Sequence, residues 1–212
     1  AMKAIVGRAY RRTPVFSGTM TYLVLNPSWW VPKNIALRDK LPEIRRDPGV
    51  LERQGFEVWQ NGNRVAAAGI DWTALGSEHF PYNLRQLPGP ENALGQVKFI
   101  FPNPFNVYLH DTPARHLFER EERDLSSGCI RLEKPLELLD WVLLAAPGWS
   151  PARARATQAA GEETVVRLTE HIPVHIEYRT AWVDDRGVAQ FRADIYARVA
   201  RIAAALDRHP PR

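Results

Sequence analysis

The sequence predicts a mainly β protein of the α+β class with flanking helices. Apolar runs typical of buried strands occur near the start, at 3–8 and 20–25, and return at 97–101. The segment between them, 28–94, differs in composition and interrupts the two β-rich halves. A clear amphipathic helix is expected at 133–144, where apolar residues fall near helical spacing. We therefore expect one domain over 1–212 that carries an inserted subdomain at about 28–94.

Length and composition fit a single soluble domain. The chain has 212 residues, of which 45% are hydrophobic and 25% are charged, as in ordinary globular proteins. A chain of this length can bury a core without disulfides. The net charge of +4 is spread along the sequence, and no zinc-finger spacing or long basic stripe is present, so we expect no nucleic-acid partner. No apolar run reaches the roughly 20 residues of a membrane span, and the start shows no secretory signal.

The insertion combines short helices, a hairpin and a long loop. Pro and Gly punctuate it, because Pro favours the first turn of a helix and Asn-Gly favours a tight hairpin turn. Its expected elements are a helix over 33–40 after Pro32, a helix over 43–54 broken at 47–49, a strand over 56–60 turned by Asn61-Gly62, and mostly loop over 71–95.

The second half returns to strands with helices between them. The expected elements, in chain order, are strands over 97–101 and 106–110, a short helix over 113–118, helices over 133–144 and 151–160, strands over 164–168 and 174–183 with a turn at 184–187, and a helix over 194–207. We expect the helices to flank the strands.

The only cysteine, Cys129, lies in a setting that suits catalysis. A lone cysteine is often just a small buried hydrophobe. Here small residues, Ser126-Ser127-Gly128, precede it, and a substrate could approach the backbone closely. The amides of Gly128 and Cys129 could form an oxyanion hole. A thiol needs a base, and His110 is the best candidate among six histidines because it ends a strand at a Thr-Pro turn.

The spacing of these residues resembles a known family. His110, a gap of 15 residues and then Ser126-Ser127-Gly128-Cys129-Ile130-Arg131 are similar to the signature of the YkuD-type L,D-transpeptidases. Ser127 stands where the general signature has a second His, and the subfamily of large Gram-negative transpeptidases typified by YcbB also carries Ser there. Longer stretches resemble that subfamily, and the resemblance covers roughly 5–198: 10–18, 85–95, 97–103, 108–113 and 180–182.

This resemblance implies a fold and a reaction. The fold would be a YkuD-type β-sandwich with flanking helices, and the insertion at about 28–94 would be a subdomain capping the active site. The enzyme would be a cysteine acyltransferase that joins third residues of peptidoglycan peptide stems through a thioester on Cys129, with His110 as general base. It would need no metal or organic cofactor, and carbapenems would acylate its thiol.

Further site residues are expected around the thiol. Arg131 is a candidate contact for a substrate carboxylate, with a structural ion pair as the alternative. Tyr108 and Ser127 are candidates for lining the site or for hydrogen bonding. Asn92 could contact substrate from the insertion, as could three of its tryptophans, for which core packing is the default: Trp29, Trp30 and Trp72.

Other functions use the same residues. An L,D-carboxypeptidase or a lipoprotein-peptidoglycan amidase would form the same thioester, so the motif does not separate these hydrolases from a transferase. A catalytically inactive wall-binding module is the alternative from another class, and the intact His110 and Cys129 argue against it. The resemblance also implies the periplasm or envelope of a Gram-negative bacterium, and wall-binding segments elsewhere in a longer protein.

Overall fold

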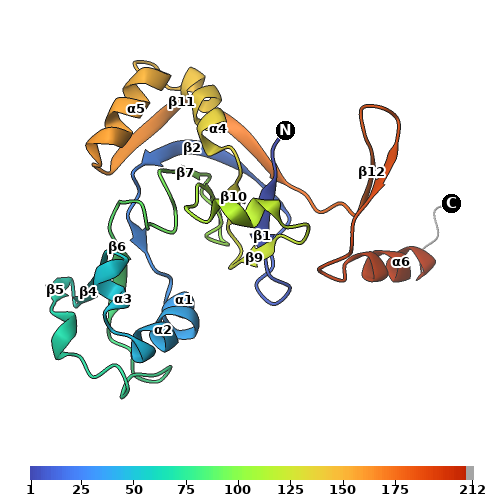
Figure 1. Cartoon of the computed structure of the whole chain (residues 1–212). Coiled ribbons are helices and arrows are strands. Elements are labelled where there is room, and N and C mark those ends of the chain that lie inside the picture. Colours follow the sequence, from blue (N-terminus) through green and yellow to red (C-terminus); the bar gives the residue numbers. More distant parts are fainter. Residues whose placement is uncertain (209–212) are drawn as a thin grey trace.

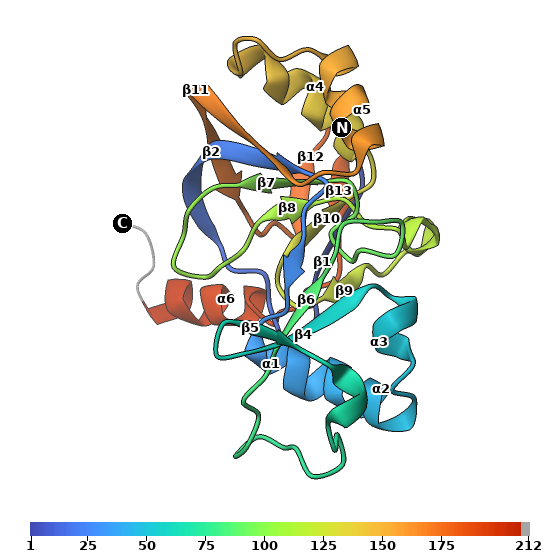
Figure 2. The same cartoon turned by 90° about the vertical axis from the view of Figure 1, so that its left-hand side faces the viewer.

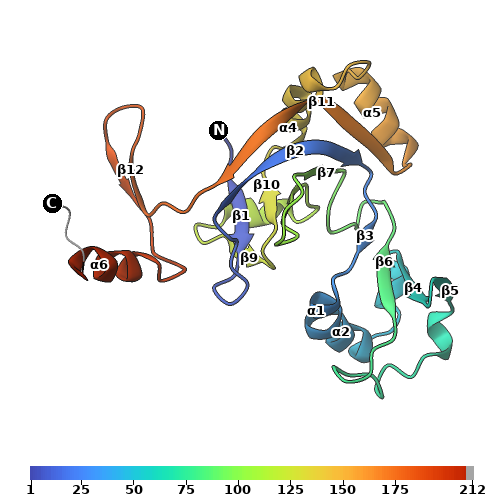
Figure 3. The ribbon, with the colours of Figure 1, turned by 180° about the vertical axis from the view of Figure 1, so that it is seen from behind.

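The computed structural model describes residues 1–208, which form a curved sheet, an inserted subdomain and a C-terminal hairpin with a helix (Figures 1 and 3). The mainly β fold class with flanking helices is confirmed. The main sheet has seven strands in the order β11-β2-β7-β8-β10-β1-β9. These strands are β1 (Ala4–Gly7), β2 (Phe16–Leu25), β7 (Val97–Ile100), β8 (Leu109–His110), β9 (Asp124–Ser126), β10 (Ile130–Leu132) and β11 (Thr164–Ile176).

The long antiparallel pair of β2 and β11 arches over the rest of the sheet (Figure 1). The register of this pair shifts where residues 168–171 of β11 face only Thr21 of β2. Such a bulge bends and twists a strand. The strand expected at 164–168 and the first residues of the strand expected at 174–183 therefore belong to a single bent strand, β11, which ends at Ile176.

Two helices cover the outer part of this sheet. They are α4 (Pro135–Val142), which continues into a 3₁₀ turn at Leu143–Ala145, and α5 (Pro151–Ala160). The sequence marks both ends of α5. The Ser150 hydroxyl accepts a hydrogen bond from the Arg153 amide at 3.2 Å. Gly161 ends the helix with a left-handed φ of 78°.

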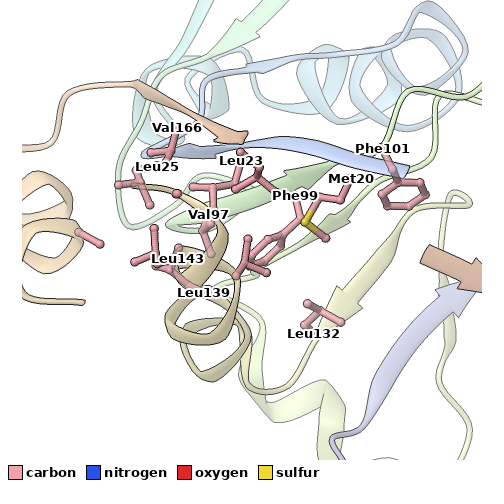
Figure 4. Close-up of a cluster of buried hydrophobic side chains, with 14 of the residues drawn as sticks. Met20, Leu23, Leu25, Val97, Phe99, Phe101, Leu132, Leu139, Leu143 and Val166 are labelled. Carbon is pink, nitrogen blue, oxygen red and sulfur yellow. The ribbon is translucent and has the colours of Figure 1, made fainter. Parts of the chain in front are cut away.

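The main core lies between α4 and the centre of the sheet (Figure 4). Leu139 and Leu143 point from the helix towards Val97 and Phe99 of β7 (Figure 4). Leu139, Val97 and Phe99 are completely buried. This core fixes the central strands from which the candidate site is built.

The elements of the inserted segment lie together on one side of the main sheet (Figure 2), and the segment has a hydrophobic core of its own. Its four-stranded sheet has the order β3-β6-β4-β5. The elements are β3 (Trp29–Trp30), α1 (Lys33–Ile35), a π-helical turn at Ala36–Lys40, α2 (Leu41–Arg46), α3 (Val50–Arg53), β4 (Phe56–Gln60), β5 (Asn63–Val65), a 3₁₀ turn at Ala67–Gly69 and β6 (Asn83–Gln86). The predicted break at 47–49 separates α2 from α3, and the Asn61-Gly62 turn joins β4 to β5.

The stretch 71–95 is mostly loop, as expected, and contains one short strand, β6, which pairs with both β3 and β4. Two other expectations in this half of the chain were wrong in detail. The strand expected over 106–110 is only the two residues of β8. The preceding residues form a turn instead, because the Asn103 side chain accepts hydrogen bonds from the amides of Phe105 and Val107 and Asn106 has a φ of 53°. The helix expected over 113–118 is a 3₁₀ helix at Arg115–Glu119.

The C-terminal part projects from the body as a hairpin and a helix (Figures 1 and 3). The hairpin pairs β12 (Ala181–Val183) with β13 (Ala189–Phe191), and the helix is α6 (Val199–Arg208). The expected helix over 194–207 starts later because the Asp194 carboxylate caps the Val199 amide at 2.7 Å and Ala197 has a φ of 51°. No helix within residues 1–208 has the length and apolarity of a membrane span.

Truncating a buried leucine should destabilise the fold more than truncating an exposed leucine in the same region. Leu139→Ala removes a completely buried side chain and leaves a cavity, so it should lower the free energy of unfolding by roughly 2–5 kcal/mol. Leu144→Ala is the matched control, because 83% of the Leu144 side chain is exposed. Urea unfolding of the two variants measures the difference, and equal losses would contradict this core.

Candidate active site

The candidate site is built on two neighbouring parallel strands, β8 and β10. Their register places Leu109 opposite Ile130 and His110 opposite Arg131. The Ile130 amide donates a hydrogen bond to the Tyr108 carbonyl at 3.1 Å. Cys129 comes directly before β10, so this pairing brings the thiol and the imidazole into the same region although they are 19 positions apart in sequence.

A cavity of about 520 Å³ lies between the sheet and the inserted subdomain. Cys129 and His110 both line it, together with Tyr108, Ser127 and Arg131, so the structure brings most of the predicted site residues together. The inserted subdomain contributes the opposite wall, which consists of Trp29, Pro32, Asn34, Ile35, Asp39, Lys40, Ala93 and Leu94. The insertion therefore lies over the thiol.

The loop before the thiol is held by hydrogen bonds from one serine. The Ser126 hydroxyl accepts from the Gly128 amide at 3.1 Å and donates to the Cys129 carbonyl at 2.5 Å. Gly128 has a φ of 119°, a conformation that side chains disfavour. The Gly128 amide is thus already engaged by Ser126. This corrects the expectation that Gly128 donates to an oxyanion and leaves the Cys129 amide as the backbone candidate.

The loop between β1 and β2 forms further hydrogen bonds with the segment before the thiol. Thr13 Oγ1 donates to the Gly128 carbonyl at 2.8 Å and accepts from the Gly7 amide at 2.9 Å. Arg11 donates to Ser127 Oγ at 2.7 Å and forms an ion pair with Asp39 of the inserted subdomain. Arg11, whose side chain is only 7% exposed, therefore ties the loop before the thiol to the opposite wall of the cavity.

His110 is held as a neutral base. Its Nδ1 lies 2.5 Å from the Asp111 carbonyl oxygen. A carbonyl only accepts, so Nδ1 carries the proton, and in the neutral ring Nε2 keeps its lone pair. Burial first, and then the charge of Arg131, lower the pKa of His110 to about 3. The imidazole is therefore neutral at physiological pH, with Nε2 available to accept a proton.

The thiol is also neutral in the free protein. Burial raises the pKa of the Cys129 thiol above its ordinary value, although hydrogen bonds from Tyr108 and the charge of Arg131 act to lower it. Burial and the neighbouring Cys129 raise the pKa of Tyr108, so its hydroxyl keeps its proton and remains a donor beside the sulfur. This arrangement favours proton transfer to the imidazole during attack over a standing thiolate–imidazolium pair.

Asp111 positions the histidine through its backbone. Its carboxylate accepts hydrogen bonds from the amides of Gln96 and Thr112 and forms an ion pair with Arg115. Gly95 packs so closely that an added Cβ would lie 2.4 Å from the Asp111 carboxyl group. These contacts fix the carbonyl that orients the His110 ring.

Some predicted residues do not take part in the site. Asn92 is 1% exposed and lies outside the cavity wall, and its amide donates to the carbonyls of Pro27 and Leu87. The predicted substrate contact of Asn92 is thus corrected to a structural role in shaping the loop. Trp72 is buried in the core of the insertion and Trp30 makes an edge-to-face contact with Trp59, so Trp29 alone of the three tryptophans lines the cavity.

Four charged residues around the site were not expected from the sequence: Arg8, Arg11, Asp39 and Lys40. The stretch 10–18 belonged to the family resemblance, but nothing in its local pattern pointed to the thiol more than 100 positions away. Within residues 1–208, no group of three or more His, Cys, Asp or Glu side chains is arranged to hold a metal ion.

A buried imidazole and a thiol that share a covered cavity define a candidate cysteine enzyme. The family model of the YkuD L,D-transpeptidase catalytic domain matches residues 1–168. A Haemophilus influenzae protein that is provisionally named an L,D-transpeptidase is 38% identical over 195 residues, which cover 92% of this chain. The chain spans 39% of the length of that relative. This chain therefore belongs to the YkuD family of L,D-transpeptidase catalytic domains.

Acid should destabilise the folded protein through His110. A histidine titrates near 6.5 in the unfolded chain but near 3 in the fold, so between these values the unfolded state binds more protons. Stability is therefore lost as pH falls through this window. Between pH 7 and pH 5, the free energy of unfolding should therefore fall by about 2 kcal/mol less in His110→Asn than in the native protein.

Urea unfolding at the two pH values measures this difference. His116→Asn is the control, because His116 is exposed and should leave the native pH dependence unchanged. The same pH dependence in His110→Asn and in the native protein would show that His110 is not held neutral.

Proposed function

We propose that this chain is the catalytic domain of an L,D-transpeptidase that joins third residues of peptidoglycan stems, with Cys129 as nucleophile and His110 as general base. The observation that carries the proposal is the shared cavity of the only thiol and a neutral imidazole whose Nε2 keeps its lone pair. Family membership supports the same chemistry.

Each proton and bond in the proposed acylation has a place in the site. The donor is a tetrapeptide stem, and the sulfur attacks the carbonyl of its third residue while Nε2 takes the thiol proton. We assign the Cys129 amide and the Tyr108 hydroxyl as the donors to the developing oxyanion. The carbon–nitrogen bond then breaks, the imidazolium gives its proton to the leaving D-alanine, and a thioester remains.

Transfer completes the cycle. The side-chain amine of a second stem attacks the thioester and loses a proton to His110, and Cys129 returns as the thiol. The covering subdomain favours transfer over hydrolysis because it limits the access of water to the thioester. Its ion pair from Asp39 to Arg11 connects this cover to Ser127, which lines the cavity beside the thiol.

The proposal includes partners and a location. Peptidoglycan tetrapeptide stems are the substrates, and carbapenems, which present a strained acyl group to the same thiol, are covalent inhibitors. Such substrates occur in the periplasm or envelope of a Gram-negative bacterium. Wall-binding segments would lie in other parts of a longer protein, in keeping with the 39% of its relative that this chain spans.

Incubation with a disaccharide-tetrapeptide, followed by mass spectrometry, tests the proposal. The native chain should release D-alanine, carry a tripeptide adduct on Cys129 and yield a dimer joined through third residues. Cys129→Ala should lose all three products and keep the fold, because only one sulfur atom is removed. Free tripeptide without dimer would identify a hydrolase instead, and an adduct on Cys129→Ala would overturn the assignment.

A further inference from the structure

The cavity contains two guanidinium groups without counterions. Arg8 and Arg131 both line it beside Cys129. The ion pairs within residues 1–208 include neither of them. The Nε atom of Arg131 is buried and has no hydrogen-bond partner among the described residues. The one carboxylate in the wall, that of Asp39, is occupied by Arg11 through hydrogen bonds of 2.5 and 3.1 Å.

The strand pairing brings the guanidinium groups of Arg8 and Arg131 to the same cavity. β1 pairs with β10, so Ile5 lies opposite Arg131, and the Arg8 amide donates to the Ser126 carbonyl at 3.0 Å where β1 ends. Both guanidinium groups line the same cavity, and burial and then the charge of Arg8 lower the pKa of Arg131. Keeping such a pair half-buried costs free energy, and an anion between the groups would relieve the repulsion.

We propose that Arg8 and Arg131 together form a carboxylate-binding subsite that holds a carboxylate of the donor stem next to Cys129. This inference rests on the proposed function for the identity of the donor. Arg8 is the new element, because it adds a second charged fork to the one expected from Arg131 and makes the subsite specific for a carboxylate over a neutral amide.

The spacing favours the terminal carboxylate of the stem. Cys129 directly precedes β10 and Arg131 lies two positions after it, so an extended backbone would bring both side chains to one face, about 6–7 Å apart. The carboxylate of a C-terminal residue lies about 4 Å beyond the carbonyl that the thiol attacks, as consecutive residues are spaced. A guanidinium at this distance reaches the carboxylate of a stem that ends one residue after the attacked carbonyl.

Alkylation of the only cysteine tests the subsite without any peptide. The same thiolate attacks the CH2 carbon of iodoacetate and of iodoacetamide and displaces iodide, but only iodoacetate carries a carboxylate. The ratio of their rate constants is therefore independent of the pKa of Cys129. The native ratio should exceed that of free cysteine, and Arg8→Gln should lower it about three- to tenfold, in the range of one partly exposed charge contact. Arg8→Lys keeps the charge and should keep most of the ratio.

Controls make this result specific. Arg186→Gln removes the same charge from the exposed β12–β13 turn and should leave the ratio unchanged. The melting temperature of Arg8→Gln should not fall, because the substitution relieves repulsion and keeps the backbone hydrogen bond to Ser126. An unchanged ratio in Arg8→Gln, or an equal drop in Arg186→Gln, would overturn the subsite.

Three donor stems identify the carboxylate. We compare kcat/KM for a tetrapeptide with its natural carboxylates, one with a C-terminal amide, and one with an amide on the side-chain carboxylate of the third residue. The native protein should disfavour the C-terminal amide about tenfold, and Arg8→Gln should lose this discrimination. If Arg8→Gln instead loses discrimination against the stem that is amidated at the third residue, the subsite stands and binds that side-chain carboxylate. If Arg8→Gln discriminates against both amidated stems as strongly as the native protein does, the proposed subsite is overturned.

The two proposals fail in different ways. If no stem acylates Cys129 but Arg8→Gln still lowers the alkylation ratio, the proposed function is wrong and the carboxylate subsite stands. If stems acylate Cys129 but the ratio does not depend on Arg8, the function stands and the subsite is wrong.

Discussion

The parallel register of β8 against β10 is the constraint on which the site depends. His110 faces the cavity because it pairs with Arg131, and Cys129 lies beside Tyr108 because the Ile130 amide bonds to the Tyr108 carbonyl. Side chains alternate between the two faces of a strand, so a slip of one residue would turn His110 away from the thiol. The core between α4 and β7, and the pairing of Lys98 with His110, hold β8 in this register.

Burial then decides the protonation states. It lowers the pKa of His110 and raises the pKa of Cys129, so both groups are neutral in the protein. The cavity also keeps positive charge next to these groups, because Asp39 is engaged by Arg11 while Arg131 has no ion-pair partner among the described residues. We propose that a negatively charged substrate balances this positive charge.

The sequence indicated the residues that share the cavity with the thiol better than it indicated the contacts around them. Cys129, His110 and Arg131 belong to one local motif with a fixed gap, and the Asn61-Gly62 turn and the caps of α5 are local signals as well. The engaged amide of Gly128 and the structural role of Asn92 depend on hydrogen bonds that only the folded loops reveal. The contact of Arg11 with Ser127 joins residues 116 positions apart, and no periodicity in either segment indicates it.

The dependence of carbapenem acylation on pH tests the central claim most directly, with native protein, His110→Ala and the exposed-site control His116→Ala. If the register of β8 and β10 delivers the base to the thiol, His110→Ala should acylate roughly 10²- to 10⁴-fold more slowly near pH 7. Part of the loss should be regained at higher pH, where hydroxide generates thiolate without the imidazole, and His116→Ala should match the native protein throughout. A near-native acylation rate of His110→Ala at pH 7 would contradict the account.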